Sequence, residues 1–249
     1  MQPVLTLQSN EKLAAAAVIE FYPLSNTGLL GYLVVDEDYR GKKLSNQLLE
    51  HTRNILQEES KLRSLSSLKS RLVEGDFNLM RIQKEYLGNE QSIDEYIGET
   101  LLKLPLMLFC ECENGQPTQD QVMDPKVRHE IYRRLGFGKL QFDYIQRLSL
   151  DDTPIVLLLL AQFVNGERDT VLSIHSVATF ILEFYKATFY TMDFPEIDNC
   201  YSHVMKSMIE HSTKDGKEQM VPILWNTNNW DDLISIFKHV EYKTFSDSD

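Results

Sequence analysis

Residues 29–56 constrain the fold of this chain more than any other stretch. Residues 29–35 form an apolar run with the composition of a buried strand, and from Lys43 onward apolar side chains recur with the period of a helix. The side chains on that helical face are Leu44, Leu48, Leu49, Ile55 and Leu56. A strand that turns at once into a helix directs unpaired N–H groups and the positive end of the helix dipole to one point. Such a unit is typical of sites that bind a pyrophosphate.

The first 165 residues predict strands and helices in alternation. Residues 14–22 and 29–35 flank the turn-forming residues 23–28, which indicates an antiparallel hairpin. Residues 4–8 alternate apolar and polar side chains, as a preceding strand would. Further strands are predicted at residues 106–112, 140–145 and 155–163, and helices at 43–75, 77–102 and 126–135. Asp124 is a candidate N-cap of the last helix, and Gly136 ends it.

Helices dominate the pattern after residue 165. They are predicted at residues 174–191, 198–213 and 230–239. The first has a broad apolar face that water would not tolerate exposed, made of Phe180, Ile181, Phe184, Tyr185, Phe189 and Tyr190. We therefore predict two parts: residues 1–165, with a helical insertion at about 57–104, and a helical extension, 166–249. The extension should pack on the first part or make a homodimer contact.

Charge and composition limit the partners and the location that we expect for this chain. The formal net charge is −12 over 249 residues, so nucleic acid phosphates and anionic bilayers would be repelled, and we expect neither as a partner. A cationic acceptor such as an amine suits this charge. The longest apolar run, residues 154–161, is far shorter than the roughly 18 residues of a membrane span. Residues 1–4 do not begin a secretion signal, so we expect a cytoplasmic protein.

The cysteines point away from metal chemistry. They are Cys110, Cys112 and Cys200, an odd number that favours reduced thiols. No second cysteine pair or nearby histidine completes a zinc site with Cys110 and Cys112, so packing is the better interpretation and we expect no metal.

Residues 40–45 read Arg-Gly-Lys-Lys-Leu-Ser, which resembles the signature of the GNAT superfamily: Arg or Gln, two residues, Gly, one residue, then Gly or Ala. Arg40 is present, Ser45 takes the final small position, and Lys43 replaces the central glycine. The resemblance implies an acetyl-CoA site whose binding residues are Leu33, Val35, Arg40, Gly41, Lys42, Lys43, Leu44 and Ser45.

A second segment supports the same family. Residues 132–137 read Tyr-Arg-Arg-Leu-Gly-Phe and resemble the family's Tyr-x-x-x-Gly-Phe segment, whose helix flanks the acyl thioester. The resemblance implies that Tyr132 is the general acid that protonates the departing thiolate. The attacking amine must lose a proton, so a carboxylate is expected near the strand ends. Glu111 is the first candidate for this base and Glu20 the second, each against the simpler interpretation of a solvated or paired carboxylate.

The resemblance covers about residues 4–163 and implies a fold of the α/β (α+β) class, a GNAT-like central mixed sheet flanked by helices. The implied activity is direct transfer of an acetyl or short acyl group from coenzyme A to an amine, without a metal. Two alternatives remain: a noncatalytic CoA-sensing or protein-interaction module, which Lys43 favours, and a purely structural helical protein, which the strand–loop–helix unit disfavours. The family normally has a strand and one or two helices before this hairpin, whereas only some dozen residues precede Ala14 here. We expect either a shortened version of the family's fold or another element in that place, with the insertion at 57–104 and the C-terminal helices as candidates.

Overall fold

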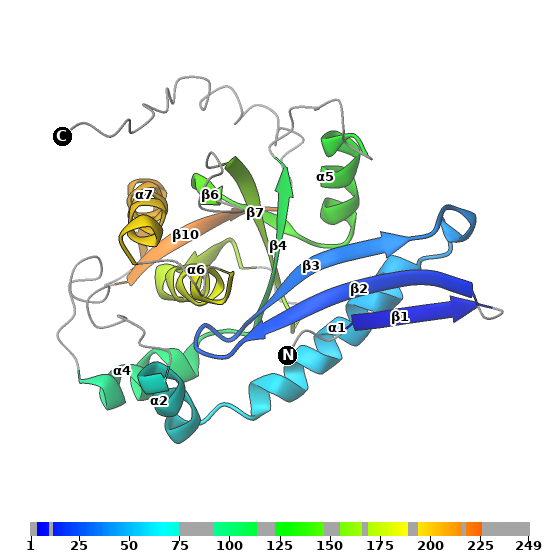
Figure 1. Cartoon of the computed structure of the whole chain (residues 1–249). Coiled ribbons are helices and arrows are strands. Elements are labelled where there is room, and N and C mark those ends of the chain that lie inside the picture. The colour runs from blue at the N-terminus through cyan, green and yellow to red at the C-terminus, as the bar shows by residue number, and fades with distance from the viewer. Residues whose placement is uncertain are drawn as a thin grey trace.

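The computed structural model describes residues 4–9, 12–74, 92–113, 123–146, 155–165, 169–188, 194–215 and 218–225. Within these ranges the chain forms a central mixed sheet with helices on both faces (Figure 1). The strands are β1 Val4–Ser9, β2 Lys12–Tyr22, β3 Thr27–Val35, β4 Met107–Glu113, β5 Gly138–Leu140, β6 Tyr144–Gln146, β7 Ile155–Phe163, β8 Val171–Ser173, β9 Thr213–Asp215 and β10 Glu218–Leu224. The helices are η1 Glu37–Tyr39, α1 Leu44–Lys61, α2 Leu65–Glu74, α4 Ile93–Glu99, η2 Leu101–Lys103, α5 Pro125–Arg134, α6 Ile174–Thr188 and α7 Phe194–His211.

The strands follow the order β1-β2-β3-β4-β7-β5-β10-β8, with β6 on β7 and β9 on β10. Neighbouring described strands run antiparallel except β3 and β4, which run parallel. Parallel neighbours need a long crossover connection, and here α1, α2 and α4 belong to it. The predicted hairpin of β2 and β3 and the preceding strand β1 are confirmed.

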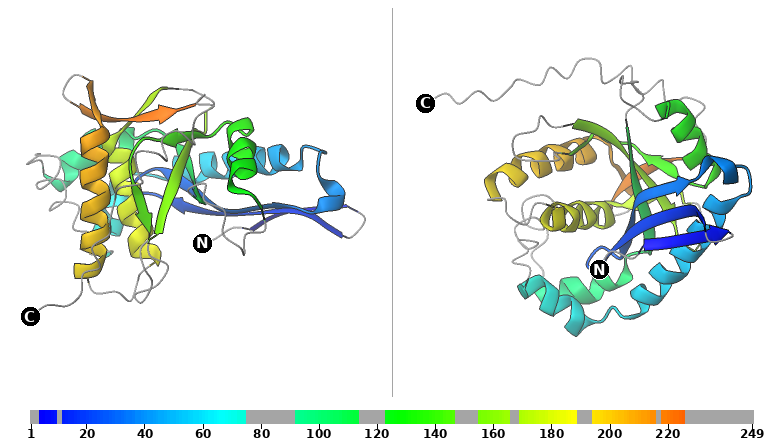
Figure 2. Two further views of the ribbon diagram at one scale, coloured as in Figure 1. Left: turned by 90° about the horizontal axis from the view of Figure 1, so that it is seen from above. Right: turned by 45° about the vertical axis from the view of Figure 1, so that its right-hand side comes forward.

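Two hydrophobic cores lie on the two faces of the sheet. One joins β2, β3, β4 and β7 to the apolar stripe of α1 (Leu48, Leu49 and Leu56) and to Phe137 after α5. The other holds α6 and α7, and there Phe180 and Tyr185 of α6 are almost fully buried. Figure 2 shows β1–β3 with α1 extending from one end of the molecule and α6 and α7 at the other.

The break between α1 and α2 corrects the sequence analysis, which predicted one helix from residue 43 to Gly75. α1 ends at Lys61 and α2 begins at Leu65. Between them Arg63 turns inward: its Nε donates to the carbonyl of Pro23 at 2.6 Å and its guanidinium also bonds to the Leu101 carbonyl at 2.5 Å. These long-range bonds outweigh the local helical preference of the segment. Of the predicted helix at 77–102, residues 77–91 lie outside the described residues.

The single strand predicted at residues 140–145 is wrong as well. The structure has two short strands there, β5 and β6, and both pair with β7. Between them Phe142 is 5% exposed and the N–H of Asp143 donates to the Ser207 hydroxyl of α7 at 2.9 Å. Tertiary contacts with α7 therefore set this bend, which a local alternation pattern does not reveal.

The chain after residue 165 differs from the helix-only prediction. Helices α6 and α7 are confirmed, and the predicted helix at 230–239 lies outside the described residues. Strands β8, β9 and β10 were not predicted: β8 and β9 have three residues each, and β10 contains Pro222, which is unusual in a strand interior. Since β10 pairs with β5 through Ile223 and Leu140, the sheet continues past residue 165. The division of the chain into two domains stays a prediction.

Candidate functional site

Strands β3 and β4 separate soon after they meet. Three residue pairs join them: Thr27 with Met107, Gly28 with Leu108 and Leu29 with Phe109. Beyond these pairs β3 stays bonded to β2 as far as Val35, and β4 to β7 as far as Glu113. The two strands therefore diverge, as Figure 1 shows. Beyond the three pairs, the facing edges of β3 and β4 are not paired with each other.

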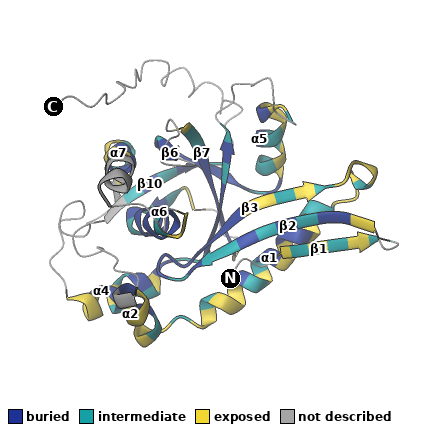
Figure 3. Ribbon diagram, viewed as in Figure 1, coloured by how far each residue is buried: buried dark blue, intermediate teal, exposed yellow. Residues whose placement is uncertain are grey.

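A β-bulge in β3 coincides with this divergence. Val18 of β2 lies opposite Tyr32, and the next residue, Ile19, lies opposite Leu30, so Gly31 has no partner on β2. An extra residue bends its strand and increases the twist. The bend turns the rest of β3 away from β4, and Tyr32, just after the bulge, is 73% exposed. Figure 3 shows the change from buried to exposed residues along β3.

The loop between β3 and α1 carries the predicted phosphate-binding residues. Arg40 bonds back to the end of β3, since its Nε donates to the Val35 carbonyl at 3.4 Å. The N-cap of α1 is Lys43, which makes no side-chain cap bond. The first N–H groups of an α-helix have no intrahelical acceptors. The start of α1 therefore offers backbone donors and a positive dipole end at the end of β3.

Two residues of this loop have left-handed backbone conformations. Gly41 has φ 79° and Lys43 has φ 59°. For an L-residue with a side chain this conformation costs roughly 1–2 kcal/mol, whereas glycine adopts it freely. Lys43 thus keeps the conformation that suits glycine at the position where the signature has its central glycine.

Basic side chains gather in the same loop. Arg40, Lys42 and Lys43 are all exposed, and the Lys42 ammonium lies 4.6 Å from the centroid of the Tyr39 ring. The three acidic residues 36–38 come directly before them and offset part of their field. The loop therefore combines the backbone donors at the start of α1 with basic side chains, and its role as an anion site stays a prediction.

Helix α5 ends in a Schellman motif, which explains the spacing of the Tyr-x-x-x-Gly-Phe segment. The N–H of Phe137 donates to the Tyr132 carbonyl at 3.0 Å, and that of Gly136 to the Arg133 carbonyl at 3.1 Å. Gly136 has φ 90°, and a Cβ there would lie 2.7 Å from Nε2 of Gln162. The rings of Tyr132 and Phe137 meet edge to face at 5.6 Å, the apolar contact that accompanies this motif.

The Tyr132 side chain lies against β4 where β4 leaves β3. Its hydroxyl hydrogen-bonds with the thiol of Cys110, and the side chain packs on the core that contains α1. Burial, with the thiols of Cys110 and Cys112 beside it, raises the pKa of Tyr132 above its ordinary value. Tyr132 therefore keeps its proton at neutral pH.

Glu111 lies on the opposite face of β4. Its Oε1 accepts a hydrogen bond from the Tyr144 hydroxyl at 2.5 Å. Burial raises the pKa of Glu111 to about 7; hydrogen bonds from Tyr144 and Gln146 act in the opposite direction, and the charge of Glu20 adds to the rise. Glu20 in turn accepts a hydrogen bond from the Tyr22 hydroxyl at 2.7 Å. The two candidate bases thus share one face of the sheet.

Comparisons with known proteins point to one family for the first part of the chain. Residues 2–72, which contain β1, β2, β3, the loop and α1, match the family model described as the acetyltransferase (GNAT) family. This part of the chain is similar to the GNAT superfamily. The matched stretch is less than half of the chain, so it identifies neither an activity nor an acceptor. A search of curated proteins found no match.

Several solved GNAT structures are similar to the chain at low identity. The ribosomal-protein-S18-alanine N-acetyltransferase from Escherichia coli is 15% identical, with a TM-score of 0.34, over 68% of this chain and 72% of that one. A GNAT-family acetyltransferase from Bacteroides thetaiotaomicron is 12% identical, with a TM-score of 0.41, over 76% and 73%. Because both TM-scores are below 0.5, these structures add nothing to the match of residues 2–72.

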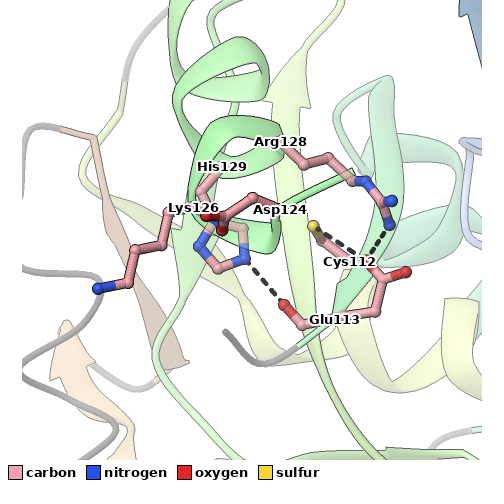
Figure 4. Close-up of polar contacts among 6 residues, drawn as sticks. All are labelled: Cys112, Glu113, Asp124, Lys126, Arg128 and His129. Carbon is pink, nitrogen blue, oxygen red and sulfur yellow. Dashed lines mark hydrogen bonds and ion pairs between the residues drawn. The ribbon is translucent and has the colours of Figure 1, made fainter. Parts of the chain in front are cut away.

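A polar cluster at the end of β4 fixes α5 in place (Figure 4). The Glu113 carboxylate bonds to Arg128 of α5, and Nε2 of His129 lies 2.8 Å from the Glu113 carbonyl oxygen. At the start of α5 the Asp124 carboxylate accepts the N–H of Lys126 at 2.9 Å, which confirms the predicted N-cap. These contacts hold α5, and hence Tyr132, against the sheet.

The predicted GNAT site residues fall into two groups. Glu20, Glu111 and Tyr132 flank the place where β3 and β4 part, whereas residues 40–45 follow the end of β3, about 20 Å further along that strand. Sequence analysis missed Tyr144 and Gln146, because only the fold brings them to Glu111. The roles of all these residues stay predictions.

The side chains of Leu33 and Val35 pack towards α1, so only their backbone groups remain on the edge of β3 for a ligand. Among the described residues, no group of three or more His, Cys, Asp and Glu side chains could hold a metal ion. None of the described helices has the length and apolar character needed to cross a membrane.

Proposed function

We propose that this chain is a GNAT-type enzyme that transfers an acetyl or short acyl group from coenzyme A to an amine. One observation carries the proposal: a parallel strand pair parts after three residue pairs, and one of its strands leads through the loop of residues 36–43 to a helix start that has no side-chain cap and carries the family's motif. A ligand with phosphates at one end and a reactive thioester at the other end of a long pantetheine arm matches this arrangement.

The phosphate end would lie at the start of α1. The backbone N–H groups of Leu44 and Ser45, in the first turn of α1, are the donors suited to a pyrophosphate. Arg40 and Lys42 would add charge at its rim. Leu33 and Val35 would contact the arm through their backbone, since their side chains face α1.

The reacting end would lie where β3 leaves β4. A neutral amine attacks the thioester carbonyl, the carbon–nitrogen bond forms, the carbon–sulfur bond breaks, and one proton leaves the nitrogen while one reaches the sulfur. Glu111, with a pKa raised by burial to about 7, is suited to take the first proton. Tyr132, on the other face of β4 and protonated at neutral pH, is suited to give the second. Glu20 is the alternative base.

A thiol-release assay tests this proposal. Wild-type chain with acetyl-CoA and a panel of primary amines should release thiol with at least one acceptor. The rate should rise with pH through about 7 to a plateau, because Glu111 must be ionised to accept a proton. Glu111→Gln should lose this rise and about 10²-fold or more in rate, and Tyr132→Phe should lose a similar factor. A matched control is Glu58→Gln, a change on the exposed face of α1.

A noncatalytic interaction module is the second candidate, and one observation favours it. The outer face of β1–β3 aligns Val4, Val18 and Tyr32 in one row, and no described helix covers that row. Val4 is 61% and Tyr32 73% exposed, as a protein-binding surface would be. Saturable acetyl-CoA binding without thiol release for any amine would favour this module over the enzyme.

A further inference from the structure

Tyr144 is a buried polar side chain that the proposed proton transfers do not use directly. It is 0% exposed, and β6 holds it beside β7, where it pairs with Leu157. A buried phenol needs a hydrogen-bond partner. Its partner is Oε1 of Glu111, 2.5 Å from the phenol oxygen. The contact joins two strands whose residues lie 33 positions apart.

The strand that carries Tyr144 is itself fixed. The hydroxyl of Tyr185, on α6, donates to the carbonyl of Ile145 in the middle of β6. Tyr144 and Gln146 flank Ile145, so both side chains project to the face on which Glu111 lies. Gln146, 5% exposed, is the second hydrogen-bond partner of the Glu111 carboxylate. Glu111 therefore has two hydrogen-bond partners, Tyr144 and Gln146, on a strand that a hydrogen bond from Tyr185 links to α6.

Opposing influences act on the ionisation of Glu111. Burial and the charge of Glu20 on β2 favour the neutral acid. Hydrogen bonds from Tyr144 and Gln146 stabilise the carboxylate. The other titratable groups that face this cluster are Tyr22 of β2 and, on α6, Tyr185 and Glu183, each linked to it by its influence on Tyr144 or Tyr22.

We propose that Tyr144 is a positioning residue for acyl transfer: it holds the Glu111 carboxylate at the divergence of β3 and β4 and keeps it able to ionise near neutral pH. The catalytic part of this inference rests on the proposed function. The control of Glu111 by Tyr144 does not, because it follows from the hydrogen bond alone.

Tyr144→Phe tests the proposal, since it keeps the ring and removes only the hydroxyl. The Glu111 side-chain carboxyl is followed by carbon NMR against pH, with its signal assigned by its loss in Glu111→Gln. The loss of a hydrogen bond to the charged form should raise the pKa of Glu111 by about one to two units. In thiol release, the midpoint of the rise with pH should move upward by the same amount.

Tyr96→Phe is the matched control. Tyr96 is 2% exposed in the same core, and its hydroxyl is hydrogen-bonded to Thr179 instead of Glu111. This variant should leave both midpoints in place. Thermal melting of both variants separates a loss of folding from a change in titration.

The NMR titration and the thiol-release profile together test both parts of the proposal. A carboxyl titration that is the same in wild type and Tyr144→Phe would overturn the control of Glu111 by Tyr144. A titration that moves while the rate profile stays fixed would overturn the positioning role in catalysis. If the wild type acylates no amine, the proposed function fails, and the NMR titration alone still tests whether Tyr144 governs Glu111.

Discussion

Lys43 stands where the GNAT signature has its central glycine, and its backbone has φ 59° and ψ 25°. The position requires a left-handed backbone because the chain turns there from the loop into α1. Sequence alone predicted the loop, since its residues are adjacent in the chain. It did not predict that the lysine would keep the conformation of the residue it replaces.

Lys43→Gly should therefore stabilise the chain. Relief of the left-handed conformation should raise the free energy of unfolding by roughly 1–2 kcal/mol. The greater freedom of glycine in the unfolded chain should lower it again by about half of that amount. We expect a gain of up to about 1 kcal/mol, or a melting temperature roughly 2–4 °C higher. Lys42→Gly is the control, because Lys42 does not have a positive φ and should gain nothing. Equal shifts in both variants would refute the strain at Lys43.

Residue motifs of short range were predictable, and contacts of long range were not. Tyr132, Gly136 and Phe137 form a cap within six residues, so their spacing is visible in the sequence. Glu111 could be named as a candidate from its strand, but its partner Tyr144 is joined to it only through the order of β4, β7 and β6.

At the scale of elements, the turn between β2 and β3 organises the region before the divergence. Glu183 of α6 accepts the N–H groups of Leu24 and Ser25, at 2.9 and 2.7 Å. Arg63, in the break between α1 and α2, donates to the carbonyls of Pro23, at 2.6 Å, and Leu24, at 3.2 Å. These bonds link α6 and the break between α1 and α2 to the turn between β2 and β3. The sequence predicted the helices and the turn but not the break, because the interactions that stabilise it come from distant segments.

Arg63→Met should destabilise the chain by about 2–4 kcal/mol, because it keeps an apolar stem and leaves buried carbonyls without a donor. Arg63 also lowers the pKa of Glu183, which burial raises to about 7. Without Arg63 the ionised Glu183 costs more, so the loss should be larger at pH 8 than at pH 5. Lys61→Met is the control: its ion pair with Glu58 is exposed, and its loss should cost under about 1 kcal/mol. Urea unfolding at both pH values measures this, and equal losses in the two variants would contradict the anchoring role.

At the scale of the whole molecule, one sheet carries both ends of the candidate site and also the strands of the second half. The mixed sheet flanked by helices agrees with the predicted fold class. The strands after residue 165 were not predicted, because β8 and β9 have only three residues each and β10 contains a proline. β10 becomes a strand by pairing with β5 and β8. The apolar face of α6 was predictable from its spacing, and its described residues are buried as expected.

Calorimetric titration of the full chain with acetyl-CoA tests the central claim most directly. We predict saturable binding at one site, weakened about tenfold or more by Arg40→Glu and by Ser45→Trp, since both change the start of α1. Lys61→Glu reverses a charge at the far end of the same helix, about 25 Å away, and should leave the affinity unchanged. No saturable binding, or the same affinity in all three variants as in the wild type, would contradict a coenzyme A site at the start of α1.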